Sequence, residues 1–512
     1  MSLNVADAIS HWASRKPDGA AVVEDGRRIS FAAFDGAVWR ACAEWRQAGI
    51  SPGRNVGISL PNSVLYLVAF YGLARLGATV LPLPIDEPAD YRAELIRRFG
   101  AMAVIGDAAG TAVPSLQPAR RWLDAPPVRP DPDLRVDGGD RRLKIAFSSG
   151  TTGRPKAVLR THWASLEIDR HRRQAVPQFP EDVFVALLDM GTSYGLRPCL
   201  RTLDVGGTVV IAQKGIGAAD FVSLVESSAA TQLALTPFHA MAMMAEVRRP
   251  SPMLRSVREL VISTANCPHG LRQEIRRRLT PGLIVSYGSN EVNVLAVADG
   301  QLQDAFPDCV GRCVPGIEVE AVDDNECPVP PGTMGVLRFR APWFPSGYVD
   351  DEAASRKAFR AGWFYPGDTG VLGPDKVIHL KGRVDDVINF DGVKIAPLDI
   401  EAVLLAHPAV VEAAAFPMPS RIHQQVPVAA VTVRTATSTE ELLAFARERL
   451  GTRGPAQVIV LPTLPKNKMG KVLKSELVRL LAPAMPAPGA SAPRGSTSGI
   501  GPNSDSKPSD RG

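Results

Sequence analysis

Between about Val56 and Val294, short apolar runs alternate with longer segments of helical periodicity. The apolar runs predict strands at Val183–Leu188, Thr208–Ala212, Gln232–Thr236 and Glu259–Ser263. The most apolar stretch, Val64–Leu83, is interrupted by Arg75 and Gly77, so it predicts a helix and a buried strand rather than a membrane span. This alternation predicts βαβ units, and therefore mainly parallel sheets with helices on their faces.

The pattern changes in the second half of the chain. Short strands and turns from about Gln303 to Gly347 predict a small β-rich subdomain. A polar stretch at Gly382–Asp386 then precedes a segment with expected strands near Val410–Phe416, Pro427–Val433 and Gln457–Leu461. Ser438 and Glu441 form a capping box, which predicts the start of a helix.

These patterns predict an α/β protein of two domains and a tail. The large N-terminal domain, residues 1–384, is expected to combine parallel α/β subdomains with the small β-rich subdomain. A smaller α+β domain is expected at residues 385–481. Residues 482–512 are dominated by Pro, Gly, Ser and Ala, which is typical of a disordered tail.

Composition narrows the class of function. The 512 residues are 45% hydrophobic and 22% charged, and a mean hydropathy of +0.00 excludes a wholly disordered or membrane-embedded chain. The net charge of +5 lacks the clustered basic field that nucleic acid requires. Six cysteines are scattered singly, and Asp7 and His11 interrupt the place of a signal peptide. We therefore expect a cytoplasmic protein with no nucleic-acid partner and no membrane span.

The segment Ile145–Lys156 leaves an expected strand and enters a loop of small hydroxylated residues with Gly150 and Gly153. Its backbone N–H groups and hydroxyls, together with the charge of Lys156, suit the binding of phosphates. It is not the P-loop of NTPases, because its glycines are too close together and Pro155 precedes the lysine. An ordinary Ser/Thr/Gly surface turn would explain only some of these residues.

Further segments carry candidate chemistry, and each also has an ordinary structural interpretation. Glu291 follows the apolar strand Leu283–Val285, where a carboxylate suits Mg²⁺, although a helix N-terminal charge is the commoner explanation. Asp368 lies in a Pro-Gly-Asp turn and could accept bonds from ribose hydroxyls. Arg383 lies in a similarly ambiguous turn, and Leu464–Lys471 is by default a solvated charge run.

In this order and at these separations, the segments resemble the motifs of the adenylate-forming (AMP-binding) superfamily. That superfamily contains acyl-CoA synthetases, stand-alone adenylation enzymes and luciferase-like proteins. The matching segments are Ser148–Lys156, Tyr287–Glu291, Tyr365–Asp368, Gly382–Asp386 and Pro465–Lys471. The stretch Asp35–Pro84 is also similar to the family's first subdomain, so the resemblance extends from about Val5 to Leu481.

The resemblance implies a role for each matching position. Lys156, Glu291 and Lys471 would be catalytic: Glu291 would hold Mg²⁺, and Lys471 would reach the carboxylate and the α-phosphate. Tyr287 would lie against adenine, and Asp368 would bind the ribose hydroxyls. The residues implied to bind ATP are Ser148, Ser149, Gly150, Thr151, Thr152, Gly153, Lys156, Tyr287, Gly288, Ser289, Asn290, Asp368, Arg383 and Lys471.

The resemblance also implies a mobile small domain and a second pocket. Asp385 would be the hinge about which the small domain rotates. The residues implied to line the acyl and pantetheine pocket are Thr192, Tyr194, Ala265, Gly288 and Gly392. The implied reaction is ATP-dependent activation of a carboxylic acid to an acyl-adenylate with release of pyrophosphate, followed by transfer to the thiol of coenzyme A. ATP, Mg²⁺ and coenzyme A are thus the implied cofactors and co-substrate.

Three other functions stay open. A stand-alone activating enzyme would load a phosphopantetheinyl carrier protein in trans, and a luciferase-like oxidoreductase would use the same first half-reaction. A non-catalytic protein would bind nucleotide or acyl ligand without turnover. Since Lys156, Glu291, Asp368, Arg383 and Lys471 are all present, the non-catalytic alternative is the least favoured.

Several positions depart from the family pattern. Asn290 stands where Thr is usual, and Ala157 and Asn293 stand where Gly is usual. Thr192 takes the place of a frequent His or aromatic gate, and Ser263–Cys267 lacks the usual glycines. These changes cluster where the acid is expected to bind, so the acid is not identified.

Arg197 has two interpretations. It either meets a distal polar or anionic group of the acid, or makes a structural salt bridge on a helix surface, which is the commoner case.

Overall fold

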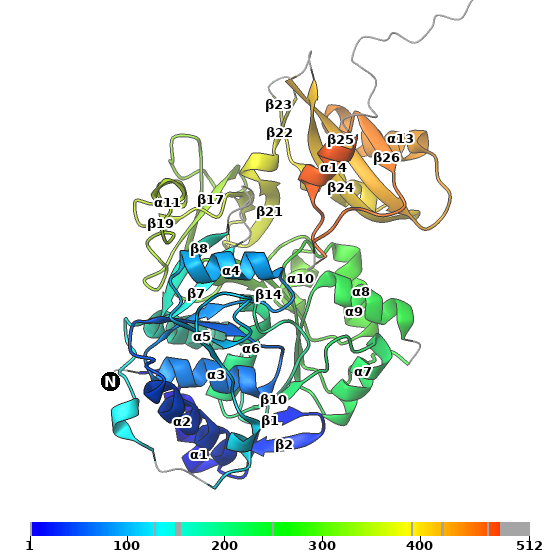
Figure 1. Ribbon diagram of the computed structural model, residues 1–512. Helices are drawn as coiled ribbons and strands as arrows, with labels where there is room; N and C mark the ends of the chain where they lie inside the picture. Colours follow the sequence, from blue (N-terminus) through cyan, green and yellow to red (C-terminus); the bar gives the residue numbers. More distant parts are fainter. Residues whose placement is uncertain are drawn as a thin grey trace, which may run out of the picture.

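The computed structural model describes residues 3–126, 130–148, 155–247, 250–390, 393–420, 424–467 and 470–481. Within these residues the chain forms four sheets, and two of them make the body of the large domain (Figure 1). The larger sheet contains, in spatial order, β15 (Arg312–Cys313), β14 (Asn293–Ala298), β13 (Leu283–Ser289), β12 (Glu259–Ile262), β11 (Gln232–Leu235), β9 (Val183–Ala186), β10 (Thr208–Ile211), β1 (Ala20–Glu24) and β2 (Arg27–Ser30). Its strands from β13 to β1 are parallel, and the outer strands are antiparallel to their neighbours.

The second sheet of the large domain ends in the hairpin that carries Lys156, the lysine of the expected phosphate loop. It contains, in spatial order, β6 (Ser115–Leu116), β5 (Ala103–Gly106), β3 (Asn55–Ser59), β4 (Thr79–Pro82), β7 (Arg142–Ser148) and β8 (Lys156–Thr161). β8 runs antiparallel to β7, with Lys156 opposite Ser148. The hairpin therefore presents both ends of the loop at one edge of the sheet.

Helices fill the space between the two sheets and cover their outer faces. The helices of the large domain are α1 (Asp7–Arg15), α2 (Phe31–Gln47), α3 (Val64–Arg75), α4 (Ala89–Arg98), η1 (Arg120–Leu123), η2 (Pro132–Leu134), α5 (His162–Ala175), α6 (Ser193–Asp204), α7 (Ala218–Ser227), α8 (Pro237–Glu246), α9 (His269–Arg278) and α10 (Gly300–Ala305). One core joins Phe70 of α3 and Leu203 of α6 to Val22 of β1 and Val56 of β3. An interior helix must be apolar all round, and α3 is buried along almost its whole length.

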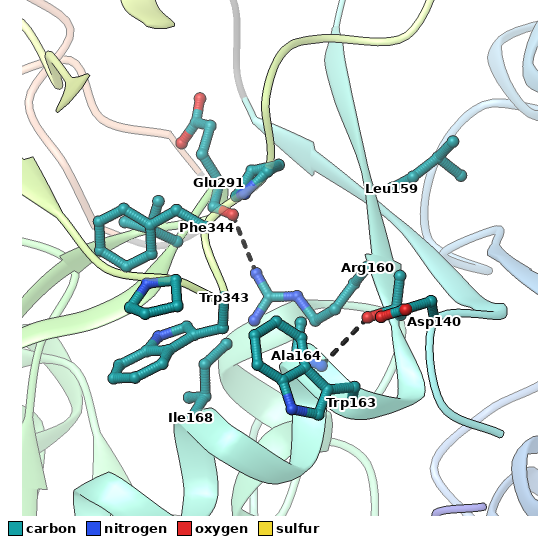
Figure 2. Close-up of a pocket in the computed structure, with 13 residues that line it drawn as sticks. Asp140, Leu159, Arg160, Trp163, Ala164, Ile168, Glu291, Trp343 and Phe344 are labelled. Atoms are coloured by element: carbon teal, nitrogen blue, oxygen red, sulfur yellow. Dashed lines mark hydrogen bonds between the residues drawn. The ribbon is translucent and has the colours of Figure 1, made fainter. Parts of the chain in front are cut away.

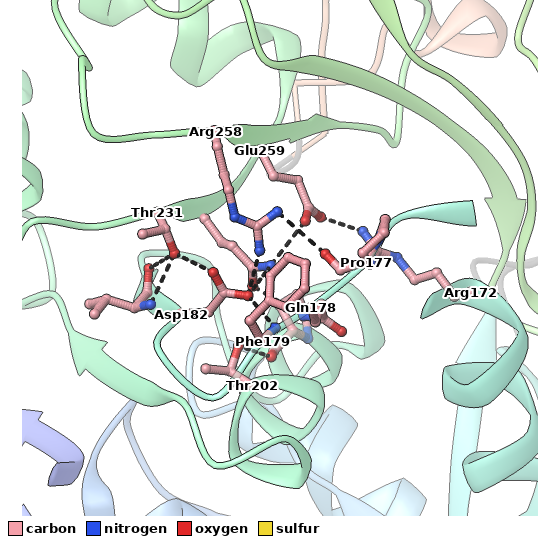
Figure 3. A network of polar contacts seen from close by, with 12 residues as sticks. Arg172, Pro177, Gln178, Phe179, Asp182, Thr202, Thr231, Arg258 and Glu259 are labelled. Carbon is pink, nitrogen blue, oxygen red and sulfur yellow. Dashed lines mark hydrogen bonds and ion pairs between the residues drawn. The ribbon is translucent and has the colours of Figure 1, made fainter. Parts of the chain in front are cut away.

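Polar side chains tie the amino ends of the central strands together. Asp182 precedes β9, Gln232 begins β11 and Glu259 begins β12. The Gln232 amide donates to Asp182 over 3.1 Å and to Glu259 over 3.0 Å. Arg172 of α5 also donates to Glu259 (Figure 3). Arg258 completes the network by donating to Asp182. These groups are partners of one another, so this edge of the sheet is held by structural contacts and the carboxyl edge is left for chemistry.

The β-rich sheet and the small domain follow in the chain. The β-rich sheet and its helix comprise β16 (Glu318–Val322), β17 (Met334–Arg340), α11 (Glu352–Ala358), β18 (Phe359–Arg360), β19 (Trp363–Phe364), β20 (Asp368–Leu372) and β21 (Ile378–Arg383). After η3 (Val384–Asp386), the small domain comprises β22 (Ile388–Phe390), β23 (Val393–Ile395), α12 (Pro397–Leu405), β24 (Val410–Ser420), β25 (Gln424–Val433), α13 (Thr439–Leu450), η4 (Gly451–Arg453), β26 (Gln457–Val460) and α14 (Lys474–Leu481). Figure 1 shows the small domain, in yellow to red, beside one end of the large domain.

The predicted α/β class is confirmed, and many boundaries agree with the sequence pattern. β9, β10, β11 and β12 begin at the predicted residues. Ser438 caps α13 by accepting from the Glu441 N–H over 3.1 Å. β24 continues past the predicted end at Phe416, because Pro417 lies opposite Pro427 in the ladder, where neither residue needs to donate to the other.

The expected domain limits stay predictions. The expected boundary between residues 384 and 385 lies within η3, between the β-rich sheet and the small domain's sheet. The expected disordered tail lies outside the described residues. No helix in the described part of the chain has both the length and the apolar character needed to cross a bilayer.

Candidate active site

Three residues expected to contact the nucleotide form one polar network. Asp368 begins β20 and lies opposite Arg383, the last residue of β21. One carboxylate oxygen of Asp368 accepts from Arg383 Nη1 over 3.1 Å, and the other accepts from the Tyr287 hydroxyl over 2.5 Å. Burial and the nearby Asp368 raise the pKa of Tyr287, so its hydroxyl keeps the proton that it donates. β13 and the β-rich sheet thus place an aromatic ring, a carboxylate and a guanidinium together.

A second cluster surrounds Glu291, which follows the end of β13. The Glu291 side chain is buried, and its Oε1 accepts from the Tyr348 hydroxyl over 2.9 Å. Lys156 Nζ lies 5.3 Å from the centre of the Tyr348 ring, a cation–π distance. Tyr348 therefore connects the phosphate-loop lysine to the carboxylate that is expected to hold the metal.

A cavity of about 140 Å³ lies on the opposite side of the Glu291 backbone (Figure 2). Its wall includes Arg160, Trp163 and Trp343. Figure 2 shows the Arg160 guanidinium reaching the Glu291 carbonyl, while the Glu291 carboxylate points away from the cavity. The cavity therefore borders the Glu291 turn on the side away from its carboxylate.

The basic turn of the small domain lies against the large domain. Asn467 and Lys471 exchange hydrogen bonds, with the Lys471 N–H donating to the Asn467 side chain over 3.0 Å. Gly470 has φ +79°, and a Cβ added there would lie 2.9 Å from Cβ of Phe238. Because Phe238 belongs to α8, directly after β11, this contact places Lys471 near the carboxyl edge of the central sheet. Lys471 itself is exposed.

Asp385, the expected hinge, lies in η3 between the two domains. Its side chain is 67% exposed, and its carboxylate is 3.9 Å from Lys357 Nζ. A residue that must change its backbone angles during rotation needs few fixed contacts, and this position meets that condition. The hinge role itself stays a prediction.

Two of the expected acyl-pocket residues belong to the start of α6. Thr192 caps the helix by accepting from the Gly195 N–H over 3.0 Å. The Tyr194 hydroxyl lies 3.1 Å from the carbonyl oxygens of both Leu235 and Val261, which belong to the neighbouring strands β11 and β12. Tyr194 therefore fills space at the carboxyl edge between two strands. Capping α6 is thus a structural role for Thr192, in addition to the acyl-pocket role that the resemblance implies.

The remaining described positions differ in what explains them. Gly288 is required by the backbone, because an added Cβ would lie 2.0 Å from the Asn293 carbonyl oxygen. The Ser289 hydroxyl is buried and, among the described residues, has no hydrogen-bond partner, which suits a ligand contact. The Asn290 side chain is exposed. Ala265 follows Thr264, whose φ of +79° marks a sharp turn after β12.

Part of the expected site lies outside the described residues. These positions are Ser149, Gly150, Thr151, Thr152, Gly153 and Gly392. For Ser148 only the backbone, as the last residue of β7, is described. Of the expected phosphate loop, the structure thus describes the two flanking strands, β7 and β8.

Arg197 is a buried member of an ion pair, which favours its structural interpretation. Its side chain is 4% exposed, and its Nε donates to Asp169 over 3.0 Å. It also donates to the hydroxyl and the carbonyl of Ser165. The expectation of a helix-surface arginine was wrong in one respect, because α6 packs this face against α5 in the interior.

We expect Arg197→Leu to lose stability and keep its selectivity. Removing one partner leaves the Asp169 carboxylate buried and unpaired, which costs about 3 to 5 kcal/mol. Denaturant unfolding would measure that loss, and Arg197→Lys should lose less. A stable Arg197→Leu protein with altered preference between mono- and dicarboxylic acids would show instead that Arg197 contacts substrate.

The sequence reasoning missed two residues that contact Glu291 and a third that lies opposite one of them in the β7–β8 ladder. Tyr348 holds the carboxylate, while Arg160 and Lys144 are neighbours across the β7–β8 ladder, both buried. Burial, then the charges of Arg160 and Arg197, lower the pKa of Lys144 to about 7. Strand alternation was the available signal, because it places Lys156 and Arg160 on one face of β8. No sequence signal indicated that Tyr348 meets Glu291.

Comparison with known proteins places these clusters in context. The family described as AMP-binding enzyme matches residues 9–349, and the AMP-binding enzyme C-terminal domain matches residues 399–471. One similar protein is 4-coumarate–CoA ligase 5 of Oryza sativa, which is 27% identical over 90% of this chain and 91% of that protein. Another is a salicyl-AMP ligase / salicyl-S-ArCP synthetase of Mycobacterium tuberculosis, which is 29% identical over 93% of this chain and 90% of that protein. The fold is similar to that of ATP-bound MatB from Rhodopseudomonas palustris, with a TM-score of 0.85 at 23% identity over 94% of this chain and 99% of that one.

Proposed function

The chain belongs to the AMP-binding enzyme family, and from this membership we propose that it is an acyl-CoA synthetase. It would join a carboxylic acid to AMP with release of pyrophosphate, and then transfer the acyl group to the thiol of coenzyme A. Similar proteins that are named as CoA ligases or synthases, and that this chain matches along most of their length, support this proposal.

The observation that carries the proposal is the meeting of two clusters at the end of β13. In the first cluster, Tyr287 donates a hydrogen bond to Asp368. In the second, Tyr348 donates to Glu291, and its ring lies beside Lys156. The first cluster suits a nucleoside, since the Asp368 oxygens have further lone pairs for ribose hydroxyls. The second suits a phosphate chain with its metal. One strand end thus offers groups for both parts of ATP.

The residues present fit a Mg²⁺ ion. Glu291 offers a buried carboxylate, and among the described residues only its Oε1 has a hydrogen-bond donor, Tyr348. The described residues hold no group of three or more His, Cys, Asp or Glu side chains that could ligate a metal together. Magnesium is commonly bound by one or two carboxylates plus phosphates and water, so one glutamate suffices. When bound, the ion would neutralise charge on the phosphate oxygens.

In the first half-reaction, a carboxylate oxygen of the acid attacks the α-phosphorus of ATP. A bond forms from that oxygen to phosphorus, the bond to the bridging oxygen breaks, and pyrophosphate leaves. Because two anions must approach each other, fixed cations and positioning supply most of the catalysis. Lys156 would neutralise the leaving phosphates, and Lys471 the carboxylate and the α-phosphate.

In the second half-reaction, the thiol of coenzyme A loses its proton to solvent and its sulfur bonds to the acyl carbon. The bond from that carbon to the phosphate oxygen breaks, and AMP leaves. Rotation of the small domain about Asp385 would withdraw Lys471 and admit the thiol. An acyl-adenylate is a reactive anhydride, so closure of the small domain over it would also exclude water. The contact of Gly470 with Phe238 suits the arrangement for adenylation, in which Lys471 has not been withdrawn.

A carrier protein is the second candidate acceptor. The similar salicyl-AMP ligase is also named as a salicyl-S-ArCP synthetase. Both acceptors would present a phosphopantetheine thiol, so the first half-reaction is common to them.

Pyrophosphate release tests the proposal. Purified protein is given MgATP with aliphatic acids of short, medium and long chain, aromatic acids and amino acids, each with and without coenzyme A. Release with one class of acid, together with the matching acyl-CoA, supports a CoA ligase. Release without acyl-CoA, and acylation of a phosphopantetheinylated carrier protein, would favour the second candidate. No release with any acid would argue against both.

A further inference from the structure

The turn that carries Glu291 is a short connection between two antiparallel strands. β13 ends at Ser289 and β14 begins at Asn293, and these two residues are paired in the ladder. Asn293 has φ +69°, a left-handed conformation that Asn tolerates better than most residues. The carbonyls of the turn lie outside the ladder, so they need partners from elsewhere.

Arg160 supplies those partners. Its Nη2 donates to the Asn290 carbonyl over 3.2 Å and to the Glu291 carbonyl over 3.1 Å. The Arg160 side chain is buried, and within the described residues it forms no ion pair with a carboxylate. Figure 2 shows its guanidinium reaching the Glu291 carbonyl from the wall of the cavity.

The charge of Arg160 is costly at this place. Its neighbour across the ladder is Lys144, which is also buried and whose Nζ lies 3.3 Å from the Ser193 hydroxyl. Burying a cation is unfavourable unless it is hydrogen-bonded. The two carbonyls of the turn bond Nη2 of Arg160, whereas its buried Nη1 has no hydrogen-bond partner among the described residues.

Both ends of Glu291 are thereby tied to one strand. Its carbonyl is held by Arg160, and its carboxylate is held by Tyr348, whose ring lies beside Lys156. Arg160 and Lys156 both belong to β8 and lie on the same face of it. The turn and the phosphate-loop hairpin therefore share a direct connection.

We propose that Arg160 is a positioning residue for the Mg²⁺ carboxylate, fixing the Glu291 turn relative to the phosphate-loop lysine. The inference rests on the proposed function, because it assumes that Glu291 holds Mg²⁺ beside ATP. Partners that orient a metal ligand commonly contribute about 10- to 100-fold to metal affinity.

The test measures nucleotide binding rather than turnover. Binding of α,β-methylene-ATP is followed by calorimetry over a series of MgCl₂ concentrations, and in EDTA, for the wild type, Arg160→Leu and Arg160→Lys. Arg272→Lys is the matched control, because Arg272 is similarly buried and donates to the carbonyls of Cys267, Pro307 and Cys309. Melting temperatures are recorded for all four proteins.

We expect Arg160→Leu to need about tenfold more Mg²⁺ for half-maximal strengthening of binding, with affinity in EDTA unchanged. Arg160→Lys should recover part of that loss, since it keeps a charged donor. Arg272→Lys should melt earlier but keep the wild-type Mg²⁺ dependence. Unchanged Mg²⁺ dependence in Arg160→Leu, or equal loss with and without Mg²⁺, would overturn the positioning role. Failure of the wild type to bind the nucleotide would instead overturn the proposed function.

Discussion

Lys471→Ala is expected to lose adenylation and keep thioester formation. Its ammonium is proposed to neutralise the acid and the α-phosphate as they approach, and removing one such group typically costs about 100- to 1,000-fold in rate. Thioester formation from supplied acyl-adenylate needs no such neutralisation, so its rate should stay within about twofold of the wild type.

The two half-reactions are measured separately. Pyrophosphate release from MgATP and acid reports the first, and acyl-CoA formation from synthetic acyl-adenylate reports the second. Lys466→Ala is a matched control in the same turn, because the Lys466 ammonium is already paired with Glu412. Equal loss of both half-reactions in Lys471→Ala would remove Lys471 from its proposed role.

Glu291→Gln is expected to lower the rate of pyrophosphate release by about two to three orders of magnitude. The amide keeps the size of the side chain and can still accept from Tyr348, but it loses the charge that favours a divalent cation. A bound cation supplies several kcal/mol of charge stabilisation, and each 1.36 kcal/mol is about tenfold in rate.

Steady-state rates over a series of Mg²⁺ concentrations test this expectation. Glu291→Gln should require more Mg²⁺ for half-saturation. Tyr348→Phe keeps the Glu291 carboxylate, so its rate of pyrophosphate release should fall by at most about tenfold. A Glu291→Gln enzyme with the wild-type rate and Mg²⁺ dependence would show that another group holds the metal.

The sequence predicted the family and the α/β class, and the comparisons confirm both. It also predicted an AMP-forming acid–thiol ligase, which the relatives named as CoA ligases or synthases support. Those predictions depend on local signals. Apolar runs locate β9 to β12, and Ser438 with Glu441 locates the start of α13, because periodicity and capping act over a few neighbouring residues.

Contacts between distant segments were harder to predict. Asp368 and Arg383 were both named, but their pairing depends on the register of β20 and β21. Tyr348 meets Glu291 only because the β-rich sheet packs beside β13, and nothing near Tyr348 in sequence indicates that contact. Arg197 was expected on a surface but is buried. Its burial depends on the packing of α6 against α5, which the sequence near Arg197 does not indicate.

The roles of the individual site residues remain predictions. Tyr287, Asp368 and Arg383 lie together, and so do Lys156 and Glu291, which is the geometry that those roles require.

The central claim is that the acid's own carboxylate attacks the α-phosphorus. The most direct measurement uses an accepted acid labelled with ¹⁸O in its carboxylate, with MgATP and coenzyme A, and mass spectrometry of the products. The account predicts AMP that carries one ¹⁸O atom from the acid, together with unlabelled pyrophosphate. Formation of ADP, or AMP without the label, would contradict it.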